Sequence, residues 1–225
     1  MKKVLYDQLV IERKHCRACI GLRNPAEGDL AEYDSNEIGP WARLHGDLDA
    51  SIMVVGQDWG DVRYFHRNCG FDDLSNRTIR TLERLLIAAG VEISLREYGP
   101  KEGRLFLTNA ILCLKDGGLQ GPVLNSWFSN CSKFLKKQIE IVSPPVVVAL
   151  GEKAYRAIVK SFGLSPKRFR DVVRTEEDII LPNGNRFFPV YHCGARILNT
   201  HRPLYMQIQD WERVGKAIAR VGAQS

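Results

Sequence analysis

Hydrophobic and polar positions along this chain fall into blocks of two kinds. Short apolar runs bounded by turn-forming residues are typical of buried strands, and they cover residues 51–55, 104–108, 146–150 and 187–191. Longer blocks carry apolar residues at helical spacing, and they cover residues 4–14, 78–89, 127–141, 152–162 and 204–221. Gly90 and the Pro144-Pro145 pair stand just beyond two of these blocks, where helices are expected to end.

The order of these blocks predicts the fold class. Strands alternate with helices, which is typical of a parallel sheet covered on both faces. We therefore expect an α/β fold with three α/β/α layers, a central, mainly parallel four-stranded sheet and an N-terminal, cysteine-bearing extension over residues 1–50. Because we find no internal repeat or linker, we expect one domain over residues 1–225.

Polar residues stand where three of the predicted strands end. Gln57 and Asp58 follow the first strand, Asn109 ends the second, and His192 follows the fourth. Parallel sheets bind ligands beyond the carboxyl ends of their strands. The sequence therefore predicts that these side chains converge on one crevice.

The cysteines are the second candidate for chemistry. Cys16 and Cys19 form a C-x-x-C pair, Cys113 follows the second strand, and Cys131 lies early in the next helix. The chain begins with no clean secretory signal and has no run of about 20 apolar residues. We therefore expect a cytoplasmic protein with no membrane association, whose thiols are reduced and available to metals. Four thiolates suit zinc or an iron–sulfur cluster, and the alternative is a set of free, buried cysteines.

Two further cysteines, Cys69 and Cys193, stand beside the predicted crevice. Cys193 follows His192 directly, which leaves a His/Cys nucleophile or a catalytic zinc as an alternative. Charge adds one broad indication. The chain has 32 Lys and Arg against 26 Asp and Glu, a formal charge of +6, which suits a polyanion such as nucleic acid, although many basic proteins bind none.

Five segments, taken in order, resemble the uracil-DNA glycosylase superfamily, and their layout is closest to its iron–sulfur branch in bacteria and archaea. They read C-R-A-C-I-G-L-R, V-V-G-Q-D-W-G, L-T-N-A-I-L-C, C-S-K-F-L-K-K-Q-I-E-I-V-S-P-P-V-V-V-A-L-G-E-K-A and Y-H-C-G-A-R-I-L-N. Two segments depart from the family pattern. Trp59 replaces the proline of the first motif, and Cys193-Gly194 replaces the Pro-Ser or Pro-Ala of the last one.

The resemblance implies a DNA N-glycosylase, a hydrolase that flips a damaged base out of DNA and excises it to leave an abasic site. Uracil is the first candidate base. Asp58 would stabilise the cationic sugar and position water, and His192 would stabilise the departing base anion. The competing interpretation is that Asp58 caps a turn and that His192 is an ordinary strand-end histidine.

The resemblance also implies how the base is bound. Backbone N–H groups around Gln57 would hold a base oxygen, and the Asn109 amide would read the uracil edge. Phe71 is the first stacking candidate and Phe65 the second. Arg196 and Arg202 would contact DNA, at phosphates or at the gap left by the flipped base; a solvated surface is equally compatible with their positions.

For the cysteines, the resemblance implies a structural [4Fe–4S] cluster held by Cys16, Cys19, Cys113 and Cys131, with no other metal. We expect a monomer that acts on DNA containing uracil or another deaminated base. Three alternatives stay open: a catalytically weak member that binds damaged or single-stranded DNA, a glycosylase for another deaminated base such as hypoxanthine, and a zinc-dependent nucleic-acid module or hydrolase.

Overall fold

A five-stranded sheet forms the centre of the molecule, in the order β3-β2-β5-β7-β6. The computed structural model describes residues 1–39, 47–73, 75–91, 105–118, 121–175 and 177–222. Four strands are parallel and lie close to the predicted positions: β2 (Ile52–Gly56), β3 (Leu105–Asn109), β5 (Val146–Leu150) and β7 (Arg186–Val190). Arg104, predicted to open the second strand, lies outside the described residues. The prediction of four strands missed β6 (Ile179–Ile180), which pairs antiparallel with β7 at the edge.

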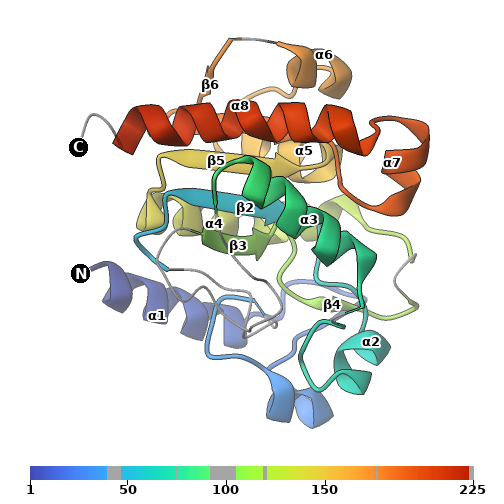
Figure 1. Cartoon of the computed structure of the whole chain (residues 1–225). Coiled ribbons are helices and arrows are strands. Elements are labelled where there is room, and N and C mark those ends of the chain that lie inside the picture. Colours follow the sequence, from blue (N-terminus) through green and yellow to red (C-terminus); the bar gives the residue numbers. More distant parts are fainter. Residues whose placement is uncertain (40–46, 74, 92–104, 119–120, 176, 223–225) are drawn as a thin grey trace.

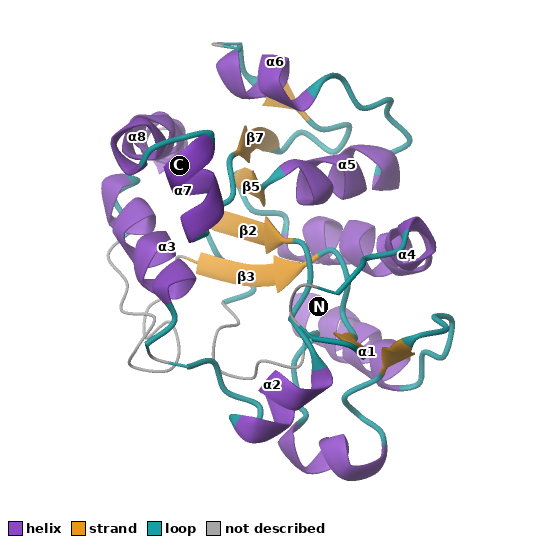
Figure 2. Ribbon diagram, turned by 90° about the vertical axis from the view of Figure 1, so that its right-hand side faces the viewer, coloured by secondary structure: helices purple, strands orange, loops and turns teal. Residues whose placement is uncertain are grey.

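Helices cover both faces of this sheet, so the three-layer α/β/α prediction is confirmed (Figures 1 and 2). The helices α3 (Arg77–Ala88) and α8 (Leu204–Gly222) lie on one face, and they pack against each other. The other face carries α1 (Lys2–Lys14), α4 (Asn125–Val142) and α5 (Glu152–Ser161). No helix within the described ranges is both long and apolar enough to cross a bilayer.

The sheet separates two apolar cores because alternate strand residues point to opposite faces. Met53 and Val55 of β2 join the core under α1, α4 and α5, whereas Ile52 and Val54 join the core under α3 and α8. Every residue of β5 is buried, as expected for a central strand covered on both sides. This continuous burial explains why the strands were readable from the sequence.

The elements that the apolar pattern missed are all short. They are β1 (Leu22–Arg23), the 3₁₀ helix η1 (Gly28–Tyr33), α2 (Val62–Arg67), β4 (Leu114–Lys115), α6 (Phe169–Arg174), β6 and α7 (Ala195–Thr200). Six residues make fewer than two helical turns, which is too short to show a helical period. The strands β1 and β4 pair with each other and tie the N-terminal extension to the segment that leaves β3.

The N-terminal extension is held by buried polar contacts as well as apolar ones. Arg13 is 1 % exposed, and its guanidinium donates to both carboxylate oxygens of Asp34 at 2.9 and 3.0 Å. The Asn24 amide donates to the carbonyl oxygens of Arg13, Lys14 and Cys16 at 3.0–3.1 Å. These bonds fix the end of α1 and the start of the C-x-x-C loop, although the sequence there reads as irregular.

Candidate active site

The loops that leave β2 and β3 run side by side and place most of the predicted polar residues. Gly56 pairs with Asn109 at the last register position of the two strands. Backbone bonds continue beyond the sheet, from Ala110 N to Gly56 O (2.9 Å) and from Ile111 N to Gln57 O (3.0 Å). The two loops therefore have a fixed relative position, although neither is a strand. We call the group Gln57, Asp58, Asn109, Lys115 and His192 the sheet-edge site.

Asp58 has both carboxylate oxygens engaged. Oδ1 accepts a hydrogen bond from the Gly60 backbone N–H at 2.9 Å. Oδ2 accepts one from Gln57 Nε2 at 2.7 Å and lies 3.4 Å from Lys115 Nζ. The Asp58 side chain is only 8 % exposed, so these contacts fix its orientation. The bond to Gly60 also shows that Asp58 does cap a turn, which is compatible with a further catalytic role.

Lys115 is the member of the site that the sequence analysis missed. It is 2 % exposed and lies on β4, two residues past Cys113. Hydropathy gives no signal for a buried lysine. Its position in the sequence could have indicated it. Lys115 comes shortly after the strand that ends at Asn109, so it lies at the same edge of the sheet.

Asn109 lies against the backbone of β2. A methyl group built on Gly56 would come within 2.1 Å of Asn109 Oδ1, so only glycine at position 56 leaves room for this amide. Within the described part of the chain, the Asn109 side-chain amide makes no hydrogen bond. It therefore keeps both a donor and an acceptor available for a ligand.

His192 is held as a neutral ring. Burial lowers the pKa of His192, and the nearby Asp58 carboxylate opposes this shift. Its Nδ1 accepts a hydrogen bond from the Gly194 N–H at 2.9 Å, so the neutral ring carries its proton on Nε2. Gly194 suits this contact, since a Cβ there would come within 3.0 Å of Nδ1. The glycine that departs from the family motif thus allows the backbone to approach the ring.

The environment of Cys193 does not suit a catalytic thiol. The side chain is 1 % exposed, and its Sγ donates to the Thr78 carbonyl oxygen at 3.6 Å. Burial raises the pKa of the thiol to about 12, which leaves it protonated at neutral pH. A His/Cys nucleophile at this place would need a thiolate. The structure therefore offers no support for that alternative.

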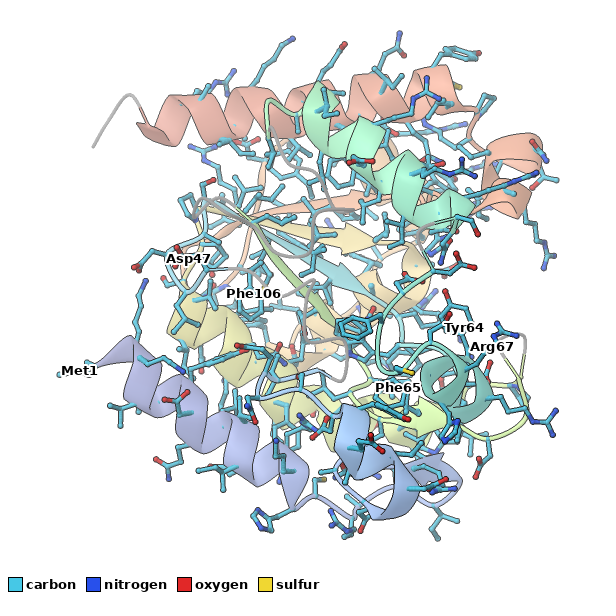
Figure 3. All side chains as sticks on the ribbon, turned by 60° about the horizontal axis from the view of Figure 1, so that its bottom comes forward. Met1, Asp47, Tyr64, Phe65, Arg67 and Phe106 are labelled. Atoms are coloured by element: carbon cyan, nitrogen blue, oxygen red, sulfur yellow. The ribbon has the colours of Figure 1, made fainter. Side chains whose placement is uncertain are left out.

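The aromatic candidates occupy different environments. Phe65 of α2 is fully buried in a cluster with Leu30, Trp59 and Leu114, so it is unsuited to stack on a base that enters from solvent (Figure 3). Phe71 is half-buried in the loop after α2, which agrees better with a stacking role. Trp59, the residue that departs from the first motif, packs closely on Gly39 and so joins the Asp58 loop to the N-terminal extension.

The two candidate DNA-contacting arginines differ in exposure and in whether the side chain has a partner within the protein. Arg196 is exposed on α7. Arg202 donates to both carboxylate oxygens of Asp210, at 2.6 and 3.0 Å, and its side chain is only 16 % exposed. The geometry therefore leaves Arg196 open to a phosphate and gives Arg202 an internal partner.

The four remaining predicted residues come together elsewhere. Cys16, Cys19, Cys113 and Cys131 all line one cavity of about 80 Å³, which we call the cysteine cavity. Helix α4 fixes the C-x-x-C loop here: Asn130 Nδ2 donates to the Ala18 carbonyl at 2.8 Å and to Cys19 Sγ at 3.4 Å. Three segments far apart in sequence thus present thiols to a common space.

The thiols of the cysteine cavity influence one another. A hydrogen bond from the Cys131 thiol lowers the pKa of Cys19 to about 6, against burial and with help from Asn130. The same bond and burial raise the pKa of Cys131, and burial raises that of Cys113 to about 12. Among described residues, no three Cys, His, Asp or Glu side chains lie close enough together to hold one metal ion. The four thiols instead line the cysteine cavity.

A buried donor gives a further test of whether a cluster fits. Arg13 lines the cysteine cavity, and its Nε is buried without a hydrogen-bond partner. Buried donors are rarely left unpaired, so this N–H calls for an acceptor. The sulfur atoms of an anionic iron–sulfur cluster are suitable acceptors. The residues present therefore fit such a group.

Comparison with known proteins agrees with this arrangement. Residues 44–213 match the family described as the uracil DNA glycosylase superfamily. The chain is 26 % identical over 209 residues to a type-5 uracil-DNA glycosylase from Pyrobaculum aerophilum, covering 88 % of this chain and 86 % of that protein. It is 25 % identical over 178 residues to a type-4 uracil-DNA glycosylase from Thermotoga maritima, covering 79 % and 82 %. With three quarters of its length inside the match, the chain belongs to the uracil-DNA glycosylase superfamily.

Proposed function

We propose that this protein is a DNA repair glycosylase that hydrolyses the N-glycosidic bond of deoxyuridine in DNA and leaves an abasic site. The observation that carries this proposal is the convergence of Asp58, Asn109 and a neutral His192 at the carboxyl edge of one parallel sheet. The relatives named as uracil-DNA glycosylases support the choice of uracil. The basic chain, with its +6 charge, suits a DNA partner inside the cell.

In this proposal Asn109 reads the flipped base. Its Nδ2 donates to O4 of uracil, and its Oδ1 accepts from N3–H. Cytosine presents the opposite pattern at these two atoms, so an amide held in one orientation discriminates against it. Because position 56 is glycine, the Asn109 amide can pack directly against the β2 backbone, which favours a fixed orientation. Phe71 stacks on the base, and backbone N–H groups near Gln57 hold its remaining oxygen.

His192 and Asp58 then act on opposite charges. As the C1′–N1 bond breaks, electrons move to the base, and the Nε2–H of His192 donates to a base oxygen that becomes negative. A neutral histidine can do this without transferring its proton. The Asp58 carboxylate stabilises the positive charge on the sugar and orients a water molecule for attack on C1′. Fixed groups of this kind stabilise the transition state because they need no reorientation during the reaction.

The cysteine cavity holds a structural [4Fe–4S] cluster in this proposal. Cys16, Cys19, Cys113 and Cys131 are its ligands, and Arg13 Nε–H and the Asn130 amide are hydrogen-bond donors around it. Such a cluster would supply a cross-link between the N-terminal extension, the segment after β3 and α4. We propose no redox step for it.

One observation favours a second candidate function. Trp59 and Cys193-Gly194, which depart from the family pattern, directly follow Asp58 and His192. A site of this kind is compatible with a protein that binds damaged or single-stranded DNA and cleaves slowly or not at all.

Abasic-site formation distinguishes the two functions. Enzyme in excess should be incubated with oligonucleotides that carry uracil, hypoxanthine or xanthine, in single strands and in duplexes, with undamaged DNA as the control. Alkali-sensitive strand breaks at uracil, accompanied by release of free uracil, support the glycosylase. Tight binding to uracil-containing DNA with no breaks above the undamaged control would leave the binding function. Faster excision of hypoxanthine than of uracil would show that hypoxanthine is the preferred base.

A further inference from the structure

Lys115 occupies an unusual position for a lysine. Its backbone N–H donates to the Gly60 carbonyl at 3.1 Å, which fixes it beside the turn that carries Asp58. Its Nζ lies 3.4 Å from Asp58 Oδ2, and the two side chains are 3 % and 8 % exposed. The preceding residue, Leu114, belongs to the apolar cluster with Trp59 and Phe65. The ion pair thus lies at the border between an apolar core and the sheet-edge site.

Stability alone does not explain a buried ion pair here. Removing an ammonium and a carboxylate from water is costly, and apolar residues of similar volume often stabilise a protein equally well or better. A methionine would fill much the same space against the neighbouring apolar cluster. The charge of Lys115 therefore calls for a functional reason, and its nearest described partner of opposite charge is Asp58.

We propose that Lys115 is a positioning residue for glycosidic cleavage, which holds the Asp58 carboxylate in the orientation that faces the reacting sugar. The inference rests on the proposed glycosylase function. Lys115 itself touches neither the base nor the sugar; it acts through Asp58.

Two contacts support this role. The Lys115 ammonium lies 3.4 Å from Oδ2, and the Gly60 N–H donates to Oδ1 at 2.9 Å, so the plane of the carboxylate is fixed from two sides. In the described chain, two titratable groups from other elements act on Asp58: Lys115 on β4 and His192 after β7.

A lysine near a newly formed abasic site has one other role to consider. An uncharged amine could add to C1′ of the abasic aldehyde, lose water to form an imine, and promote elimination of the 3′ phosphate. This role needs an amine that is uncharged and open to the sugar. The Lys115 side chain is 3 % exposed and paired with a carboxylate, so the structure favours the positioning role.

The first test compares Lys115→Met with Lys115→Arg in single-turnover uracil excision. Without the ammonium, Oδ2 of Asp58 is no longer held, so the Lys115→Met rate should fall by about 10²-fold, the loss typical of a reacting group misplaced by about 1 Å. DNA affinity should stay unchanged. Lys115→Arg keeps the charge and should restore most of the wild-type rate. Lys137→Met removes a lysine from an exposed ion pair with Glu12 and serves as the matched control.

The second test is a double-mutant cycle with Asp58→Asn. If Lys115 acts through Asp58, the double variant should cleave no more slowly than Asp58→Asn alone. The double variant should also melt at a higher temperature than either single variant, because each single change leaves one buried charge unpaired. The melting temperatures therefore still test the coupling between Lys115 and Asp58 if Lys115→Met folds too poorly for its rate to be measured.

The outcomes separate the two proposals. A rate within about threefold of wild type in well-folded Lys115→Met, well short of the expected loss, or additive rate losses in the cycle, would overturn the positioning role. A covalent adduct between Lys115 and abasic DNA after borohydride reduction would also overturn it, in favour of the amine nucleophile. If the wild-type protein excises no uracil, the glycosylase proposal fails. The melting-temperature cycle then still decides whether Asp58 and Lys115 are coupled.

Discussion

The sheet-edge site and the cysteine cavity are built in opposite ways. In the first, parallel strands in register bring Asn109 beside Gly56, and His192 follows β7, a parallel strand of the same sheet that β5 separates from β2. In the second, thiols from the N-terminal extension, the segment after β3 and α4 meet through a few side-chain bonds such as those of Asn130. Backbone pairing can hold the sheet-edge site in place without a ligand. The arrangement of the cysteine cavity is instead expected to depend on the group that binds there.

One segment belongs to both regions. Within residues 109–115, Asn109 packs against Gly56 in the sheet-edge site, Cys113 lines the cysteine cavity, and Lys115 pairs with Asp58. A change in the cavity is therefore expected to reach the sheet-edge site through this segment, while a change at the sheet-edge site should leave the cavity intact. The predictions below test this asymmetry.

The largest effect is expected from Cys131→Ala. Cys131 is 4 % exposed and lines the cavity, and its loss should remove the iron and lower the solubility of the protein. If several kcal/mol are lost, the melting temperature falls by roughly 10 °C or more, at about 2–4 °C per kcal/mol for a domain of this size. Iron analysis after anaerobic purification and thermal melting measure both effects.

The control for that experiment is Cys69→Ala. Cys69 is exposed and lies outside the cavity, so iron content and melting temperature should match the wild type. Stoichiometric zinc with no iron in the wild-type protein would contradict the cluster assignment and revive the zinc alternative.

Asp58→Asn should produce the next largest effect, confined to the sheet-edge site. The amide keeps the shape and removes the charge, so single-turnover excision should fall by about 10²–10³, as for other fixed electrostatic groups. Iron content and DNA affinity should stay unchanged. Asp7→Asn, on the exposed face of α1, is the matched control. A rate within about threefold of wild type, well short of that loss, would remove Asp58 from the mechanism.

The difference between the sheet-edge site and the cysteine cavity also explains which features could be predicted from the sequence. The strands of the sheet were readable because buried parallel strands are continuous apolar runs, and the residues at their ends followed from the sheet-edge rule. The positions of the cysteines suggested a four-thiolate site as one alternative, and the family resemblance selected an iron–sulfur cluster, since spacing cannot show that four distant thiols share a cavity. Lys115 and β6 escaped because a buried lysine and a two-residue edge strand leave no periodic signal. Only the structure could distinguish Arg196 from Arg202, because it shows that Arg202 is paired with Asp210.

Asn109→Asp tests base reading and should have an intermediate effect. A carboxyl group can present a different edge from a fixed amide, so preference should shift from uracil toward cytosine. Losing one well-placed bidentate contact costs about 1–3 kcal/mol of discrimination, or roughly 5- to 150-fold. The ratio of single-turnover rates on uracil and cytosine measures it, with exposed Asn36→Asp as the control. Unchanged uracil activity would mean that another group reads the base.

His192→Gln should have a smaller effect, on the pH dependence of stability. Because the pKa of His192 is lowered in the folded protein, the unfolded chain binds the proton first as pH falls. The stability from neutral His192 is therefore complete above about pH 6.5, the unfolded value, and decreases as pH falls toward the folded value. The slope of melting temperature against pH in this window should be shallower in His192→Gln. Equal slopes in the wild type and in His192→Gln would contradict a neutral, buried His192.

The smallest effect is expected from Arg196→Ala, and it separates two arginines that look equivalent in the sequence. Arg196 is exposed, so its loss should weaken DNA binding severalfold on any sequence and reduce the log–log salt slope by about 0.9, the value for one phosphate contact. Arg202→Ala instead leaves Asp210, whose side chain is 6 % exposed, without its bidentate partner. It should lower the melting temperature and leave the salt slope unchanged. A reduced slope in Arg202→Ala at an unaltered melting temperature would show that Arg202 leaves Asp210 to contact a phosphate. The DNA surface would then extend from α7 to the start of α8.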